Sequence, residues 1–132
     1  MTARHAITLG AVLGALGIAI GAMVRHVVED RIDPSQLKVL EIGAHYQVYH
    51  SLALVLVGTV ARANPSRWLS AAAWLFLLGM LLFSGCLYLH VATQSTARPL
   101  MLLIPVGGSL LILAWLALAV HGWTRVPAAR SE

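Results

Sequence analysis

The sequence predicts an all-α integral membrane protein: one domain folded as an antiparallel, up-down-up-down four-helix bundle. Of its 132 residues 59% are hydrophobic and only 11% are charged, whereas a soluble domain carries about 25% charged residues. Four apolar runs each approach or exceed the ~20 residues that cross a bilayer. Because lipid offers the backbone no hydrogen-bond partners, these runs should be helices. The predicted spans are residues 6–24, 44–61, 68–91 and 100–120.

The first run has a face of glycines. Its apolar stretch is longer than the ~7–15 residues of a signal-peptide core, so we expect a retained span. The glycines recur at i, i+4, i+7 and i+11, which places them on one helix face and lets another backbone approach closely. We expect this face to pack inside the bundle rather than form a homodimer. The glycines are Gly10, Gly14, Gly17 and Gly21.

The second helix should begin well before its apolar run. Asp33, Pro34 and Gln36 match an N-cap, a first-turn proline and an N3 glutamine. A helix starting near residue 34 therefore projects beyond the hydrocarbon before the span begins at residue 44. Asn64 and Pro65 predict the cap of the third helix after a very short turn, so the second and third helices should form an antiparallel hairpin.

The fourth helix should begin at Arg98, which precedes a proline. Pro105 lies inside it and removes one backbone hydrogen bond. We expect a packing bend there rather than a break that lines a cavity. Small residues predict further close helix contacts at Gly85, Gly107 and Gly108.

Positive charges divide almost evenly between the two ends of such a bundle. Since they lie between the apolar runs rather than along a stripe, they favour loop anchors over nucleic-acid binding. Five basic residues against four predict that both termini are cytoplasmic. The end with the termini carries Arg4, Arg62, Arg67, Arg125 and Arg130, and the other carries Arg25, Arg31, Lys38 and Arg98, with Glu29, Asp30, Asp33 and Glu41.

Polar side chains converge at the end without the termini, where four of the six histidines should lie. Ionisable groups at membrane depth are costly, so they mark a buried network or a site. The candidate residues are His26, Glu41, His45, Tyr46, Gln47, Tyr49, His50, Ser84, Tyr88 and His90.

Helical spacing suggests pairs within this set. Glu41 and His45 are four residues apart, so the pair could titrate near neutral pH. Tyr46 and His50 have the same spacing. His50 should lie ~9 Å below the interface, where its imidazole needs a hydrogen-bond partner. The candidate partners are Tyr46, Ser84 and Tyr88.

Three hypotheses account for the polar end. The leading one is a structural network that fixes helix packing. The second is a small-molecule or proton site at the mouth of the bundle. The third is metal or haem ligation by histidines, although no tight histidine spacing supports it. Cys86 is the only cysteine and should behave as a small hydrophobe. We therefore predict no catalytic residue, no metal site and no cofactor.

Four motifs in order resemble the domain-of-unknown-function-423 family. The motifs are Gly21-Ala22-x-x-x-His26, Tyr46-Gln47-x-Tyr49-His50, Leu82-Phe83-Ser84-Gly85-x-Leu87-Tyr88 and Pro105-x-Gly107-Gly108. The resemblance covers about residues 5–122 and implies a small four-span protein of the bacterial inner (plasma) membrane, with eukaryotic relatives. One departure is Arg25, which stands where the family has a small residue before the histidine. The resemblance implies no activity, cofactor or substrate.

The expected role is therefore a non-catalytic membrane component. Its expected partners are the lipid bilayer and either further copies of itself, as a homo-oligomer, or a larger membrane complex. A binding or transport unit at the histidine-rich end is the main alternative.

Overall fold

Four long helices make up the protein in a computed structural model that describes residues 1–28 and 31–125. A π-helical segment, η1 (Val24–Val28), follows the first helix. The helices are α1 (Ala3–Met23), α2 (Pro34–Ala63), α3 (Arg67–Thr93) and α4 (Arg98–Arg125). The described residues contain no strand, so the all-α prediction is confirmed. The predicted charges at Glu29, Asp30 and Arg130 lie outside the described residues.

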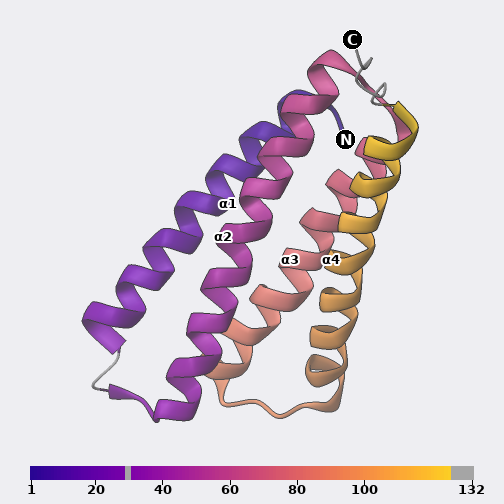
Figure 1. Ribbon diagram of the computed structural model, residues 1–132. Helices are drawn as coiled ribbons and strands as arrows, with labels where there is room; N and C mark the ends of the chain where they lie inside the picture. The colour runs from indigo at the N-terminus through magenta and orange to yellow at the C-terminus, as the bar shows by residue number, and fades with distance from the viewer. Residues whose placement is uncertain (29–30, 126–132) are drawn as a thin grey trace.

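Successive helices run antiparallel, and each packs mainly against its neighbours in the sequence (Figure 1). The main contacts join α1 to α2, α2 to α3, and α3 to α4. The start of α1 and the α2–α3 turn share one end of the molecule, and the α3–α4 connection lies at the other (Figure 1). The two inner helices, α2 and α3, are therefore covered on both sides.

Local capping fixes where α2 and α3 begin. The Asp33 side chain accepts a hydrogen bond from the backbone N–H of Ser35 at 2.8 Å, so Asp33 is the N-cap that the sequence indicated. The cap of α3 differs from the prediction. Ser66, not Asn64, is the N-cap of α3, because its hydroxyl accepts a hydrogen bond from the backbone N–H of Leu69 at 3.2 Å.

The α3–α4 connection is tied to the start of α2. Gln94 ends α3 in the left-handed region, with φ 53°. Its side-chain amide donates to the Val91 carbonyl at 3.0 Å and its side-chain oxygen accepts from Gln36. The Gln36 side chain therefore joins the start of α2 to the end of α3. The sequence predicted that this residue, at N3, would cap the first turn of its own helix, and its side chain bonds Gln94 instead.

Three helices are long and apolar enough to cross a membrane: Ala3–Val28, Arg67–Thr93 and Arg98–Thr124. The fourth, α2, does not reach that standard, because its residues 41–50 include six of the ten candidate polar residues. It lies between α1 and α3, and two of its polar side chains are buried in the bundle: Gln47 is 6% and His50 7% exposed. Residues 44–61 remain a predicted span.

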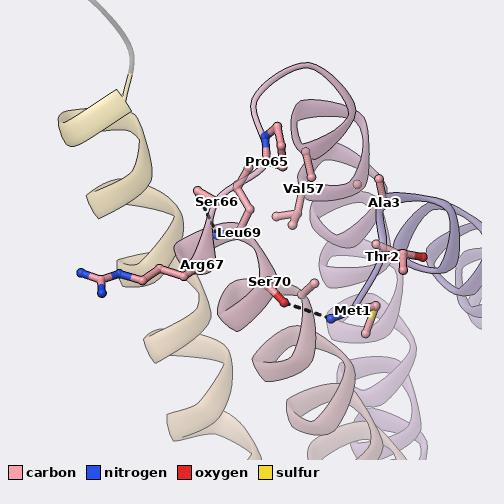
Figure 2. A pocket seen from close by; sticks show the side chains of 13 residues that line it. Met1, Thr2, Ala3, Val57, Pro65, Ser66, Arg67, Leu69 and Ser70 are labelled. Atoms are coloured by element: carbon pink, nitrogen blue, oxygen red, sulfur yellow. Dashed lines mark hydrogen bonds between the residues drawn. The ribbon is translucent and has the colours of Figure 1, made fainter.

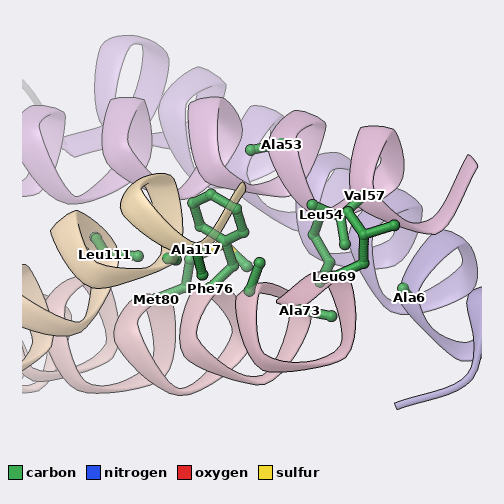
Figure 3. Packing of buried hydrophobic residues seen from close by; sticks show 12 residues of the cluster. Ala6, Ala53, Leu54, Val57, Leu69, Ala73, Phe76, Met80, Leu111 and Ala117 are labelled. Atoms are coloured by element: carbon green, nitrogen blue, oxygen red, sulfur yellow. The ribbon is translucent and has the colours of Figure 1, made fainter. Parts of the chain in front are cut away.

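A hydrophobic core joins α2, α3 and α4, with Ala6 contributed by α1 (Figure 3). Phe76 on α3 is completely buried, and its ring meets that of Trp115 edge-on, with centroids 5.3 Å apart. Leu54 on α2 and Leu69 on α3 fill the part of the core nearer the chain start. Phe76 thus anchors α4 to the inner pair, and α4 stays helical through Pro105.

Glycines allow both outer helices to approach closely. A Cβ added at Gly10 would lie 2.9 Å from the Ser51 carbonyl oxygen of α2. One added at Gly107 would overlap the backbone of α3, at 2.9 Å from the Leu82 carbonyl carbon and closer still to the Phe83 nitrogen. Only residues without a side chain permit these contacts.

Other predicted packing glycines are less tightly enclosed. An added Cβ would make ordinary contacts at Gly14, Gly21 and Gly108, with nearest atoms at 3.5, 3.9 and 3.7 Å. At Gly85 it would meet no described atom within 4 Å. The within-chain contact expected at Gly85 is therefore not seen.

Candidate functional site

Gln47 is the centre of the buried polar residues. Its side-chain N–H donates to the Leu13 carbonyl of α1 at 2.7 Å, and its side-chain oxygen accepts from the Tyr88 hydroxyl of α3 at 3.0 Å. One amide therefore connects three helices. We call Gln47, Leu13 and Tyr88 the glutamine junction.

Two glycines make room for this junction. A Cβ at Gly17 would lie 3.4 Å from Cγ of Gln47 and 2.9 Å from the Val48 side chain. A Cβ at Gly43 would lie 2.7 Å from Cε1 of Tyr88. Gly17 thus lets the amide reach the α1 backbone, and Gly43 lets the phenol ring lie against α2.

His50 lies in an aromatic pocket rather than in an interhelical hydrogen-bond network. Its Nδ1 is 2.6 Å from the Tyr46 carbonyl of its own helix, and since a carbonyl only accepts, Nδ1 carries the proton. Its ring centroid is 5.8 Å from that of Phe76 and 6.3 Å from that of Trp115. Of the three predicted partners only Tyr46 bonds His50, and through its backbone, because the residue faces aromatic rings.

The predicted Glu41–His45 pair is replaced by other partners. Glu41 pairs with Arg25 of η1 at 3.6 Å, and both side chains are partly solvated, so the pair adds at most ~1 kcal/mol. The His45 ring stacks on the ring of Tyr49 of its own helix, with centroids 6.2 Å apart. Arg25, the departure from the family pattern, is therefore a charge partner for α2.

The remaining candidates are spread over the same end. His26 is exposed on η1, while Nδ1 of His90 donates to the Ser95 carbonyl at 2.7 Å. Tyr46 is 42% exposed and contacts Phe83, with ring centroids 4.7 Å apart. Ser84 is buried, and its hydroxyl has no hydrogen-bond partner among the described residues. Within the described residues, no three His, Cys, Asp or Glu side chains are grouped so as to hold a metal ion.

Two cavities meet at Tyr88. One, of about 360 Å³, is apolar and extends past Val24 and Leu40 toward the end of α3. The other, of about 230 Å³, reaches Gln47 and Gly85. Ile20 and Tyr88 line both. Gly85 thus borders open space beside the glutamine junction.

The opposite end holds polar contacts that the sequence reasoning passed over. A cavity of about 430 Å³ lies among the starts of α1 and α3 and the end of α2 (Figure 2). The Met1 amino group donates to the Ser70 hydroxyl at 3.0 Å across it. His121 is buried, with Nδ1 2.9 Å from the Ser66 hydroxyl. A lone histidine near a helix end carries no spacing signal that would have identified this contact.

Comparisons with known proteins agree with the predicted resemblance. The sequence model of the family described as "Protein of unknown function (DUF423)" matches residues 20–108. A UPF0382 membrane protein of Staphylococcus haemolyticus is 35% identical over 114 residues, covering 86% of this chain and 91% of the relative. The UPF0382 membrane protein YwdK of Bacillus subtilis is 34% identical over 115 residues, covering 86% and 92%.

A UPF0382 membrane protein of Haemophilus influenzae is 33% identical over 114 residues, covering 86% of this chain and 89% of the relative. No solved structure matches the chain. The matched family region contains the glutamine junction residues Gln47 and Tyr88 but begins after Leu13. The chain is a membrane protein that belongs to the DUF423 family.

Proposed function

We propose that the protein is a non-catalytic structural component of the bacterial inner membrane, acting as a homo-oligomer or within a larger membrane complex. The observation that carries this proposal is the glutamine junction. An amide, a phenol and a backbone carbonyl satisfy one another across α1, α2 and α3. Its polar atoms are used to join helices.

The energetics of a bilayer support this role. Lipid chains are as apolar as the helix surfaces, so hydrophobicity does not drive helices together inside the membrane. Interhelical hydrogen bonds contribute ~0.6 kcal/mol on average and up to ~2 kcal/mol. The two bonds of Gln47 join α2 to both of its neighbours, and the Ser51 hydroxyl adds a contact to Sδ of Met80 on α3 at 3.6 Å.

The proposal places both termini in the cytoplasm. Arg4, Arg62 and Arg67 lie at the end with the start of α1. The only carboxylates in the described ranges, Asp33 and Glu41, belong to the start of α2 at the opposite end. In the sequence, basic residues number five at the end with the termini and four at the other, where Arg25, Arg31, Lys38 and Arg98 lie. An excess of Lys and Arg on one side favours the cytoplasmic face for that side.

A double-mutant cycle tests the structural role. Gln47→Leu, Tyr88→Phe and the double variant would be unfolded in mild detergent and followed by circular dichroism. Gln47→Leu should cost ~1–3 kcal/mol, because it leaves the Tyr88 hydroxyl without its partner. Tyr88→Phe should cost less, and the two effects should be coupled by ~0.5 kcal/mol or more.

His50→Phe is the matched control. His50 lies three residues from Gln47 and is equally buried, but its hydrogen bond stays within α2 and its ring packs among aromatic rings. We expect a cost below ~1 kcal/mol. Additive effects of Gln47→Leu and Tyr88→Phe, or a His50→Phe variant as unstable as Gln47→Leu, would contradict a helix-joining role for the junction.

A ligand-binding role is the second candidate, favoured by the two cavities that meet at Tyr88. Gly85→Leu should place a side chain in the smaller cavity, which Gly85 lines, since an added Cβ at this position has no described neighbour within 4 Å. Native mass spectrometry from mild detergent would reveal a small molecule on the unmodified protein. Its loss in Gly85→Leu, with stability unchanged, would favour binding over structure.

A further inference from the structure

Two arginines line one concavity between the start of α1 and the end of α2. Arg4 and Arg62 share it with Ala3, Ile7 and Thr8, and its volume is about 490 Å³. Both arginines are exposed. This arginine cleft, formed by those five residues, is separate from the glutamine junction and lies at the end of the molecule where α1 begins (Figure 1).

The cleft concentrates positive charge without compensation from the protein. Neither Arg4 nor Arg62 forms an ion pair or hydrogen bond to the residues that the structure describes. Arg4 also lies in the first turn of α1, where the helix dipole disfavours a cation. An anion bound between two like charges that line one concavity stabilises both of them.

The depth of the cleft identifies the anion's surroundings. On α2, Glu41 and Arg62 are 21 residues apart, which is about 32 Å along a helix. The hydrocarbon core of a bilayer is ~30 Å thick. Arg62 therefore lies at the boundary where lipid phosphates lie, and Ile7 continues the cleft toward the hydrocarbon.

From the paired charges and their depth we propose that the arginine cleft binds the phosphate of an anionic phospholipid. Guanidinium groups bind phosphate oxygens through paired, charge-assisted hydrogen bonds. The Thr8 hydroxyl lines the same concavity and offers one further donor. The acyl chains of the lipid would lie along the apolar surfaces of α1 and α2 below the cleft. This site does not depend on the structural role of the glutamine junction.

The test compares variants that lose the same charge at opposite ends. Full-length protein in neutral detergent would be titrated with phosphatidylglycerol or phosphatidylcholine, and bound lipid counted by native mass spectrometry. The cleft variant is Arg4→Gln with Arg62→Gln, and the control is Arg31→Gln with Arg98→Gln. Wild type and control should prefer phosphatidylglycerol, and the cleft variant should bind it at least about tenfold more weakly.

Further arms make each result decisive. Arg4→Lys with Arg62→Lys should retain part of the preference, and circular dichroism would establish that all variants are folded. Equal weakening in the cleft and control variants would attribute binding to net charge and overturn the proposal, as would unchanged binding in the cleft variant. If inorganic phosphate stabilises the lipid-free protein as much as phosphatidylglycerol does, and Arg4 and Arg62 are required, the lipid assignment is overturned in favour of a free-phosphate site.

Discussion

The α1–α2 and α3–α4 hairpins bring helices together by the same means but secure them by different chemistry. Glycines allow close approach in both, at Gly10 and at Gly107. Within the α1–α2 pair, Gln47 then adds a buried hydrogen bond to the Leu13 carbonyl. The middle of the α3–α4 pair is apolar and aromatic instead. Because lipid does not drive helix association, each pair needs another source of stability. The α1–α2 pair has a buried hydrogen bond, and the middle of the α3–α4 pair has close apolar packing.

Gly107→Ala should give the largest effect, because it acts on the middle of the α3–α4 pair, which depends on packing; the Ser66–His121 contact lies at the end of that pair. The new Cβ would overlap the backbone of Leu82 and Phe83, which cannot rotate away. We expect a loss of ~1–3 kcal/mol from overpacking, measured as a lower melting temperature in detergent. Gly108→Ala is the control, since its nearest neighbour is the Phe83 ring at 3.7 Å. Equal stability of the two variants would show that α4 can move away from α3 at little cost.

Gly17→Ala should have a smaller effect on the α1–α2 pair. Its Cβ would meet side-chain atoms of Val48 at 2.9 Å and Gln47 at 3.4 Å, and side chains can shift by a few tenths of an ångström. We expect ~1 kcal/mol of destabilisation, partly offset by the better helix propensity of alanine. Gly14→Ala, with its nearest atom at 3.5 Å, should be neutral or stabilising. A Gly17→Ala variant as unstable as Gly107→Ala would erase the distinction between the two hairpins.

Periodic and local signals in the sequence were informative for the fold. The apolar runs locate the helices, Asp33 locates the start of α2, and the glycine stripe of α1 faces α2. These features depend on neighbours along one helix. Ser66 shows the limit of such signals, because Asn64 and Ser66 are both good caps and only the geometry of the turn selects the serine.

The sequence predicted which residues belong to the candidate site but not which of them contact one another. Spacing of four residues correctly finds neighbours on α2, yet it cannot say which of them faces another helix. His50 contacts aromatic rings and its own helix, whereas Gln47, whose i+4 neighbour is Ser51, reaches two other helices. Gly43, four residues before Gln47, is buried against Tyr88. A glycine one turn from a polar residue in an apolar run is the signal that could have indicated the junction.

The α1–α2 connection and the α3–α4 connection should respond differently to pH. This is the smallest of the predicted effects. Hydrogen bonds from the Ser35 hydroxyl and backbone N–H hold the pKa of Asp33 below its usual value. The folded pKa is therefore lower than the unfolded one, so the cap contributes fully above about pH 4. It is lost as the pH falls through the lower, folded pKa. The α3–α4 connection has no carboxylate among its described residues.

Amide chemical shifts in detergent micelles provide the measurement. The chemical shift of the Ser35 amide should change at acidic pH as Asp33 is protonated and the first turn of α2 loosens. The shift of the Ala97 amide, which donates to the Ser95 hydroxyl at 3.2 Å, should stay constant. Asp33→Asn keeps a capping oxygen but cannot ionise, so it should abolish the Ser35 titration and leave the helix start in place. A Ser35 titration that persists in Asp33→Asn would assign the pH response to another group and remove this difference between the hairpins.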